Sequence, residues 1–589
     1  MRSSGKEPFA KKVNGRTRVL QAFLLVWAVV LTGRLVQLQV FRHAAAKAEV
    51  EGQNLNIRDI FPERGTIFDC NNHILARSIP ARSVFLMPVK GESLDAQLEK
   101  VRALRPTLGL DDEDVQSISK KILKGETFIY LRRKVSPETA EAVKALKLSG
   151  VSSQADTMRS YPNGTLGAHV LGGLSVDNMG QAGVEYSHNG ELQGKKGKAL
   201  IQLDARRREY FFETLSASVP GRDITLTIDE TMQYVAEREL DKIAKATLAN
   251  WGAVIVSRPD TGEILAMASY PTYDPNLYSS AGDAARYNRA IQHSFEPGST
   301  FKIVTASAAL AHHTVGLGET FDCSKDDSDI PGRPIRDHKP FGVLTFPEIV
   351  INSSNKGIAQ VGKRVGDLSL YDMAASLGFG RKTGIDLAGE ESGKLKPVSG
   401  WSRRTLYSIS MGYEVAATPL QILQAVNIVA NRGVMVPPRI IKDDIDPGEP
   451  LKRRPANETR RVMPEDAALT LTDILERVVL EGTGTQAKVA GYRIAGKTGT
   501  TQKWDSALRA YSPLRHIASF VGFAPADKPV LSVIVVVDEP KGEAYYGGDV
   551  AAPVFHEIVK NALREMGLFP ERIPVKGVIT AQLAGEAKR

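Results

Sequence analysis

Three short polar motifs occur in order in this chain and contain the residue types that acyl transfer by a serine requires. They are Ser299-Thr300-Phe301-Lys302, Ser353-Ser354-Asn355 and Lys497-Thr498-Gly499-Thr500, and their first residues lie 54 and 144 positions apart. A serine hydroxyl is a poor nucleophile until a base accepts its proton. Each motif alone arises often by chance, whereas all three in this order indicate a serine nucleophile at Ser299.

The residues around Ser299 predict a buried helix that would make Lys302 the base. Pro297-Gly298 introduces the motif, and the run from Phe301 to Leu310 is mostly apolar. Ser299 and Lys302 are three positions apart, so they share one face of a helix. Burial lowers the pKa of a lysine and leaves a neutral amine that can accept the serine proton. The alternative is a helix-capping serine with a solvated lysine, which the apolar neighbours disfavour.

The second motif would support the proton transfers. Ser353 and Asn355 stand just before a helical run, Gly357 to Val365. We expect Ser353 to relay a proton to the leaving amine and Asn355 to hold a substrate amide. A helix cap followed by a loop is the simpler alternative for these two residues.

The third motif lies on a predicted strand and would bind the substrate. Lys497, with the hydroxyls of Thr498 and Thr500, would hold a carboxylate through charge-assisted hydrogen bonds. Gly499 would let a substrate backbone approach closely. The backbone N–H groups of Ser299 and Thr500 would form an oxyanion hole. An edge lysine beside a turn is the alternative.

The same lysine completes a phosphate-loop pattern, G-x-x-x-x-G-K-T, from Gly491 to Thr498, and a later strand ends in Asp538-Glu539. A phosphate loop must open a helix whose N-terminal amides face the phosphates. Here the residues before Lys497 alternate as in a strand, and polar, loop-like sequence follows the motif. We therefore reject a P-loop ATPase and expect no bound nucleotide.

The motifs fall in a segment of regular elements, residues 221–570, that predicts a single α/β (α+β) domain. Asp229 would cap a long helix that ends near Leu248. Strands are expected at 252–257, 264–269, 492–500, 516–524 and 531–537, with a closing helix at 551–566. Strands at both ends of a segment with helices between them favour one domain rather than two. A polar linker is expected near 452–458.

Two regions precede this domain. Residues 19–40 are apolar enough to cross about 30 Å of hydrocarbon, and the tail before them, residues 1–18, has six basic residues and one acid. Positive charge before the span predicts a cytoplasmic N-terminus and an external remainder. A cleaved signal peptide is the rival, which the lack of small residues soon after the span disfavours.

Residues 41–220 mix strands (83–88, 127–132) with helices (94–104, 137–146), and residues 571–589 are expected to form a loose tail.

Composition excludes several other classes of protein. The chain has 589 residues, a net charge of +9 and two distant cysteines, Cys70 and Cys323. No dense Lys/Arg stripe interleaved with aromatic residues supports nucleic-acid binding. Two cysteines give neither a disulfide framework nor metal-ligand spacing, and the adjacent pair His312-His313 cannot share a helix face. We expect no metal and no other cofactor.

The three motifs, with shorter matches elsewhere, resemble the class B penicillin-binding proteins, which are peptidoglycan D,D-transpeptidases. The shorter matches are Arg64 to Asp69, Arg159 to Pro162, Ala168 to Gly172, Gly180 to Glu185, Gly412, Thr418 to Gln421, Tyr545 to Gly548 and Ala552 to Phe555. The resemblance covers nearly the whole chain after the tail. The chain departs from the family at Cys70 and Asn72, where arginine and glycine are usual.

The resemblance implies a transpeptidase domain with an antiparallel sheet and helices on both faces, on a mixed, β-rich pedestal (residues 41–220) behind one transmembrane helix. It implies that Ser299 attacks the D-Ala-D-Ala end of a peptidoglycan stem peptide, releases D-Ala and passes the acyl group to an amine of a neighbouring stem peptide. It also implies that β-lactams acylate Ser299. A pedestal in place of a polymerising domain implies a partner glycosyltransferase, together with membrane proteins of the division complex.

Several alternatives remain open at this point. A β-lactamase would be shorter and soluble, and a β-lactam sensor would need an output module that the 18-residue tail cannot supply. A catalytically dead scaffold is disfavoured by the intact motifs. Among transpeptidases of the bacterial inner membrane, the single anchor and the modest pedestal favour the cell-division type over the elongation type.

Overall fold

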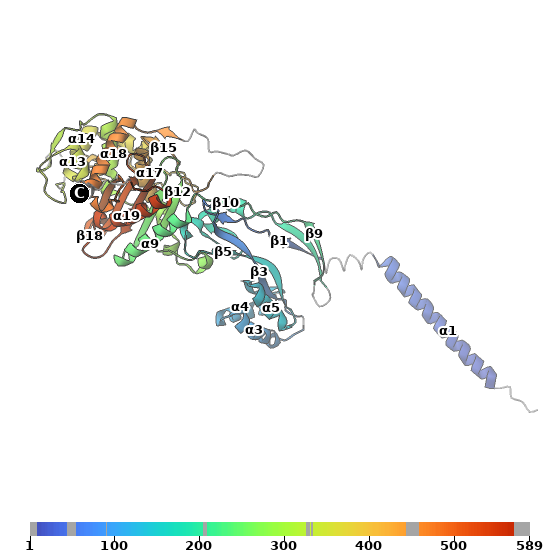
Figure 1. Cartoon of the computed structure of the whole chain (residues 1–589). Coiled ribbons are helices and arrows are strands. Elements are labelled where there is room, and N and C mark those ends of the chain that lie inside the picture. Colours follow the sequence, from blue (N-terminus) through green and yellow to red (C-terminus); the bar gives the residue numbers. More distant parts are fainter. Residues whose placement is uncertain are drawn as a thin grey trace, which may run out of the picture.

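The computed structural model describes residues 9–43, 55–89, 91–203, 209–325, 330, 334–442 and 459–570. The linker expected near 452–458 and the tail expected at 571–589 lie outside these residues. Figure 1 shows the order of the parts: an N-terminal helix, an elongated region of strands with a small helical head, and a large globular region that contains the C-terminal half of the chain.

The first helix stands apart from the rest of the described protein (Figure 1). α1 (Phe9–Val36) continues as a π-helical segment, η1 (Gln37–Phe41). Gly15–Phe41 is apolar enough to cross a membrane, with a mean hydropathy of 2.0, and its most apolar window has no buried residue. The expected span, residues 19–40, lies inside this stretch. A helix of this length with an apolar surface all round fits a single membrane anchor.

The strand-rich region contains two main sheets. An antiparallel sheet has the order β1-β8-β9, and a five-stranded sheet has the order β10-β2-β3-β4 with β5 paired to β3. The bounds are β1 (Leu55–Ile60), β2 (Ile67–Phe68), β3 (Ile74–Leu86), β4 (Ile129–Val135), β5 (Val151–Ser160), β6 (Gly173–Leu174), β7 (Gly180–Ala182), β8 (Gly197–Leu203), β9 (Glu209–Ser216) and β10 (Ile224–Thr225). The strands predicted at 83–88 and 127–132 correspond to the end of β3 and to β4.

Three helices pack on the outer end of β3 and β4 and form the small head visible in Figure 1. They are α3 (Leu94–Leu108), α4 (Asp112–Leu123) and α5 (Pro137–Ala145). The side chains of Ser93, Asp111 and Ser136 cap their N-termini by accepting backbone N–H bonds. These caps explain why helices form in a polar stretch, because each satisfies amides that the first turn leaves unpaired. The helices predicted at 94–104 and 137–146 are therefore confirmed.

A buried ion network holds the base of the pedestal together. Glu185 on α7 (Gly183–Ser187) is fully buried and accepts bonds from Arg64 Nε at 2.5 Å and Arg159 Nε at 2.6 Å. Tyr161 also donates its hydroxyl to Glu185 Oε1, at 3.2 Å. A buried carboxylate is tolerated only when it is paired and hydrogen-bonded in this way. Three of the family-like segments of the sequence thus meet at one carboxylate.

The globular region is built around one five-stranded sheet in the order β12-β11-β19-β18-β17, with every pair antiparallel. Its strands are β11 (Trp251–Ser257), β12 (Ile264–Tyr270), β17 (Ala495–Asp505), β18 (Ala510–Ala524) and β19 (Leu531–Asp538). Segments from both ends of the domain therefore lie side by side in one sheet, as predicted. β17 is an edge strand, so one side of it carries no sheet partner.

Helices cover both faces of this sheet. α9 (Glu230–Ala246) and α19 (Gly547–Glu565) pack on Val254, Phe520 and Val535, while α12 (Lys302–Ala311), α17 (Pro419–Ala430) and α18 (Glu465–Leu480) pack on the opposite side chains, such as Ile255 and Ile534. Successive strand residues point to opposite faces, and both faces are apolar because both are buried. The expected architecture is therefore confirmed.

The remaining described elements are short. They are α6 (Ala168–Leu171), α8 (Asn189–Leu192), η2 (Pro275–Ser280), α10 (Asp283–Arg286), α11 (Arg289–Gln292), η3 (Gly298–Phe301), β13 (Thr320–Asp322), β14 (Val343–Thr345), α13 (Phe346–Ile351), α14 (Asn355–Val365), α15 (Asp367–Ser376), η4 (Val398–Gly400), α16 (Thr405–Ser410), β15 (Val434–Met435), β16 (Arg460–Arg461) and η6 (Thr485–Ala487).

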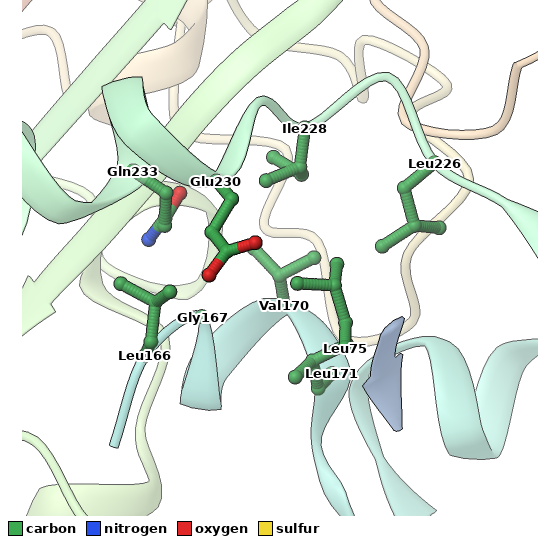
Figure 2. A pocket seen from close by; sticks show the side chains of 9 residues that line it. All are labelled: Leu75, Leu166, Gly167, Val170, Leu171, Leu226, Ile228, Glu230 and Gln233. Carbon is green, nitrogen blue, oxygen red and sulfur yellow. The ribbon is translucent and has the colours of Figure 1, made fainter. Parts of the chain in front are cut away.

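The pedestal and the globular region share a packed junction. β10 pairs in parallel with β2, and Asn276 exchanges two bonds of 3.0 Å with the backbone of Tyr161. Figure 2 shows a small cavity at this junction, where apolar side chains from β3, α6 and the segment after β10 meet the first turn of α9. Its lining is Leu75, Leu166, Gly167, Val170, Leu171, Leu226, Ile228, Glu230 and Gln233. Apolar lining at a domain junction indicates a packing gap rather than a substrate site.

Candidate active site

Ser299 lies on a 3-10 turn, η3, immediately before α12, so the prediction that it sits on the α-helix itself is corrected. The backbone N–H of Lys302 bonds to the carbonyl of Ser299. In a 3-10 turn residues three apart eclipse one another, which still places Ser299 and Lys302 on one side. Ser299 is partly exposed, and no other described residue hydrogen-bonds to its hydroxyl. The oxygen is therefore available to a substrate.

Gly298 allows the turn that carries Ser299 to pack directly on β17. Its φ is +54°, and a Cβ at this position would overlap Thr501 Oγ1. The left-handed backbone and the close approach both require glycine. Gly298 therefore fixes how close Ser299 comes to the Lys497–Thr500 strand.

Lys302 is fully buried, and its amine faces the second motif. Nζ lies 2.5 Å from Ser353 O, 3.2 Å from Ser353 Oγ and 2.7 Å from Asn355 Oδ1. Burial lowers the pKa of Lys302 to about 7, against a smaller opposing effect of Asp337. These three oxygens can accept all three N–H bonds of a protonated amine, whereas a neutral amine keeps two N–H donors and has a lone pair that can accept a proton.

The Ser353–Asn355 motif forms the turn between α13 and α14. Ser354 caps α14 by accepting from Gly357 N at 3.0 Å, and Asn355 is the first helical residue. Ser353 has a φ of +58°, an uncommon conformation for a residue with a side chain. The predicted helix at 357–365 is confirmed, and the turn before it places Ser353 and Asn355 on the same amine.

Lys497 is fully buried near the start of β17. Its Nζ lies 3.2 Å from Thr498 O and 3.4 Å from Thr498 Oγ1. Burial, and then the neighbouring Lys302, hold the pKa of Lys497 well below its usual range. The charge of Lys302 therefore disfavours a charge on Lys497, although the two lysines belong to motifs far apart in the sequence.

The remaining residues of the third motif have other contacts as well. The Thr498 hydroxyl lies 2.6 Å from Thr483 Oγ1, and Thr500 Oγ1 accepts from Gly547 N at 2.9 Å. A Cβ on Gly499 would overlap Ser519 Oγ and come within 2.9 Å of Thr300 Cγ2. Packing inside the protein therefore already requires this glycine, which is a different reason from the substrate approach that we predicted.

Comparison with known proteins agrees with this geometry. The penicillin-binding protein transpeptidase domain matches residues 252–560, and the penicillin-binding protein dimerisation domain matches residues 59–226. Peptidoglycan D,D-transpeptidase FtsI of Escherichia coli is 32% identical over 96% of this chain and 95% of its own length. Stage V sporulation protein D of Bacillus subtilis is 38% identical over 87% of this chain and 79% of its own length.

The chain belongs to the class B penicillin-binding proteins. The crystal structure of penicillin-binding protein 3 from Mycobacterium tuberculosis, complexed with aztreonam, has the same fold, with a TM-score of 0.68 and 28% identity. The match covers 87% of this chain and 98% of the chain in that crystal structure. The predicted family and fold class are thus confirmed.

In this penicillin-binding protein the phosphate-loop pattern has no phosphate-loop structure. Lys497 and Thr498 lie within β17, which begins at Ala495. The predicted strand start at Tyr492 is therefore wrong, because residues 492–494 precede the strand. Asp538 and Glu539 bind Lys503, at 2.9 Å and 2.7 Å. The pattern therefore lacks the helix N-terminus that binds phosphate.

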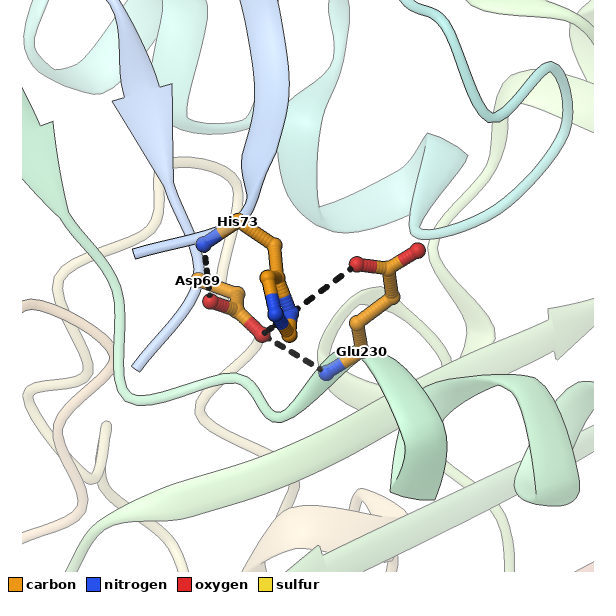
Figure 3. Close-up of side chains that lie close together, drawn as sticks. All are labelled: Asp69, His73 and Glu230. Atoms are coloured by element: carbon orange, nitrogen blue, oxygen red, sulfur yellow. Dashed lines mark hydrogen bonds and ion pairs between the residues drawn. The ribbon is translucent and has the colours of Figure 1, made fainter. Parts of the chain in front are cut away.

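One group of possible metal ligands occurs among the described residues, at the domain junction rather than at Ser299. Figure 3 shows Asp69, His73 and Glu230, with His73 Nδ1 3.2 Å from Asp69 Oδ2 and 3.3 Å from Glu230 Oε2. Asp69 also accepts backbone N–H bonds from Asn71, His73 and Glu230. These contacts hold the β2–β3 turn against the N-terminus of α9. The partial positive charge of a helix N-terminus disfavours a bound cation. We assign the group a structural role.

Sequence reasoning missed the residues that hold the Ser353–Asn355 turn from outside. Asp337 accepts from Ser354 Oγ at 2.9 Å, from Lys356 N at 3.2 Å and from Asn355 N. The Arg336 carbonyl accepts from Asn355 Nδ2 at 2.8 Å. Both residues lie in a polar stretch without helical or strand periodicity, so no sequence pattern could have found them.

Proposed function

We propose that this penicillin-binding protein cross-links peptidoglycan stem peptides through an acyl-enzyme on Ser299, in septal wall synthesis. The observation that carries the proposal is the buried Lys302 amine, one turn from Ser299, whose N–H groups are taken by Ser353 and Asn355. Such an amine is a base of the right strength at neutral pH. The cell-division role is supported by the FtsI relatives, and an elongation role is the runner-up.

The roles of the individual residues follow from this arrangement. Ser299 Oγ attacks the carbonyl of the penultimate D-Ala while Lys302 accepts its proton. The amide bond then breaks, and the terminal D-Ala leaves with a proton relayed through Ser353. An amine of a neighbouring stem peptide then attacks the ester carbonyl and forms the new amide. The ester C–O bond to Ser299 breaks, and the proton that the attacking amine loses passes to Ser299 Oγ.

Substrate binding is assigned to β17 and Asn355. Lys497, Thr498 and Thr500 would hold the terminal carboxylate, Asn355 a substrate amide, and the backbone N–H groups of Ser299 and Thr500 the oxyanion. The position of β17 supports this assignment, because it is the edge strand of the sheet and the turn that carries Ser299 packs against it.

A membrane anchor and partner proteins complete the proposal. α1 would cross the bacterial inner membrane once, with the basic residues 1–18 in the cytoplasm and the catalytic region outside. We divide the rest into a pedestal (41–220) and a transpeptidase domain (221–570), which β10 joins through its pairing with β2. The match of residues 59–226 to a dimerisation domain supports the view that glycan polymerisation falls to a partner glycosyltransferase.

Covalent labelling by a fluorescent penicillin tests the nucleophile. The full-length protein in detergent is compared with Ser299→Ala and with Ser279→Ala, which alters an exposed serine. We expect one label per wild-type chain and per Ser279→Ala chain, and none on Ser299→Ala. D-Ala released from a pentapeptide should follow the same pattern. Equal labelling of Ser299→Ala would refute the assignment, and localisation to the lateral wall rather than the septum would favour the elongation role.

A further inference from the structure

The segment 334–342 lies against the start of α14 and inserts one carboxylate into the Ser353–Asn355 turn. Asp337 Oδ1 accepts the backbone N–H groups of Asn355 and Lys356, and Asp337 Oδ2 accepts the hydroxyl of Ser354. Three donors from consecutive residues therefore converge on one side chain. Asp337 is only partly exposed, so these bonds are shielded from competing water.

These bonds are more than an ordinary helix cap. Ser354 already caps α14 through its own bond with Gly357 N. Asp337 adds a second anchor from outside the helix, and Arg336 O orients the side-chain amide of Asn355 through Nδ2. With Nδ2 bound there, Oδ1 of the same amide faces Lys302 at 2.7 Å. If the oxygen and nitrogen of the Asn355 amide exchanged places, an N–H would face Lys302 and the oxygen would face Arg336 O. The hydrogen bonds to Lys302 and to Arg336 would then both be lost.

The turn is also held in a conformation that it would not adopt alone. The φ of Ser353 is +58°, a left-handed conformation that is strained for a residue with a side chain. Ser353 O is the acceptor closest to Lys302, at 2.5 Å. Because Asp337 binds the three residues that follow Ser353, it stabilises the conformation that directs this carbonyl to the amine.

The charges around Lys302 give Asp337 a second effect. Among the described residues, the titratable groups that act on Lys302 or feel its charge are Asp337, His338 and Lys497. Asp337 is the one anion of the three. It raises the pKa of Lys302 and so opposes part of the effect of burial.

We propose that Asp337 is a positioning residue for acyl transfer, which fixes the Ser353–Asn355 turn on Lys302 and supplies the negative charge that balances its amine. This inference rests on the proposed roles of Ser299 and Lys302. Asp337 itself touches neither the substrate nor the reacting atoms. Its removal therefore changes the rate and the pH dependence of acylation, whereas a purely structural residue would change stability alone.

The test measures the second-order rate constant of acylation by a fluorescent penicillin from pH 5.5 to 9, with the full-length protein in detergent. Asp337→Asn keeps the shape and removes the charge, and Asp337→Glu keeps the charge. Asp372→Asn removes one exposed charge from α15 and serves as the matched control. Thermal melting of each variant separates loss of fold from loss of rate.

We expect Asp337→Asn to acylate about tenfold or more slowly at its optimum, because a small misplacement of a catalytic group is costly. The acidic limb of its pH profile should move to lower pH, because Lys302 loses its anionic neighbour. Asp337→Glu should restore the position of that limb, and Asp372→Asn should match wild type.

Two results would overturn the inference. One is an Asp337→Asn profile that superimposes on wild type within about twofold, and the other is an equal displacement in Asp372→Asn. A failure of the proposed function is distinguishable, because it would appear as labelling of Ser299→Ala rather than as a change at Asp337. If Asp337→Asn does not fold, the pH profile of Asp337→Glu tests the inference instead. An acidic limb displaced from that of wild type in Asp337→Glu would contradict the proposed effect of the charge.

Discussion

Lys302 Nζ and Asn355 Oδ1 lie 2.7 Å apart, although 53 positions separate the two residues in the sequence. Lys302 begins α12 and Asn355 begins α14, so the contact joins the first residues of two packed helices. An amide oxygen accepts a hydrogen bond from the amine without adding a charge. Lys302 can therefore be held in place without the rise in pKa that a carboxylate would cause, and its amine can still work as a neutral base.

Asn355→Asp tests whether this neutrality matters. A carboxylate at 2.7 Å would favour protonated Lys302, so its pKa should rise by about 1–3 units. Acylation at pH 7 should then fall by about tenfold or more, with much of the loss recovered above pH 8.5. The measurement is penicillin acylation against pH. A uniform loss at every pH would mean that Asn355 acts through substrate contacts alone.

The wild-type acylation rate should itself depend on pH. Lys302 has a pKa of about 7, so it is mostly protonated below pH 6 and mostly neutral above pH 8. Only the neutral amine accepts the serine proton, and the rate should therefore rise with pH and level off above about pH 8. Stopped-flow acylation across pH 5.5–9 gives the profile. A rate that stays flat across this range would remove Lys302 from the role of base.

Gly298→Ala should damage both the fold near the site and its activity. Alanine at a φ of +54° costs about 1–2 kcal/mol, and the overlap with Thr501 Oγ1 adds to it. We expect a lower melting temperature and severely reduced labelling. Gly190→Ala is the control, because a Cβ there meets nothing within 4 Å and φ is not positive. Gly298→Ala with wild-type labelling would show that the close approach to β17 is dispensable.

Glu185→Gln should destabilise the pedestal. It leaves Arg64 and Arg159 buried without their carboxylate, and breaking a buried ion pair costs about 3–5 kcal/mol. Glu481→Gln, which removes an exposed pair with Arg477, should cost less than about 1 kcal/mol. Differential scanning calorimetry of both variants makes the comparison. Similar melting temperatures for the two variants would contradict the structural importance of the network.

The central sheet and the buried helix could be predicted because their patterns are local. Residues 252–257 and 531–537 are short apolar runs, and both became strands that are buried on two faces. The start of β17 could not be predicted in the same way. Residues 491–494 alternate in polarity like a strand, but Gly491 has a φ of +81° and Tyr492 donates its hydroxyl to Leu568 O, so a turn forms there.

Part of the site could not be predicted, because it depends on contacts between residues that lie far apart in the sequence. The motifs named Ser299, Lys302, Ser353, Asn355 and Lys497, and the structure brings Lys302, Ser353 and Asn355 into direct contact. The position of Ser299 depends on the close packing of Gly298 on Thr501, about 200 positions later in the chain. Asp337 has no motif of its own, because its importance comes only from the turn that it meets.

The number of protons that the two buried lysines carry should change when a ligand binds beside them. Burial and the charge of Lys302 both disfavour the protonated form of Lys497. A ligand carboxylate reverses this balance, because an anion favours the charged form of an amine beside it. Anion binding and proton uptake are then thermodynamically linked, and each strengthens the other. Calorimetric titration of Ser299→Ala with a D-Ala-D-Ala peptide, in buffers of different ionisation enthalpy, would count the protons taken up.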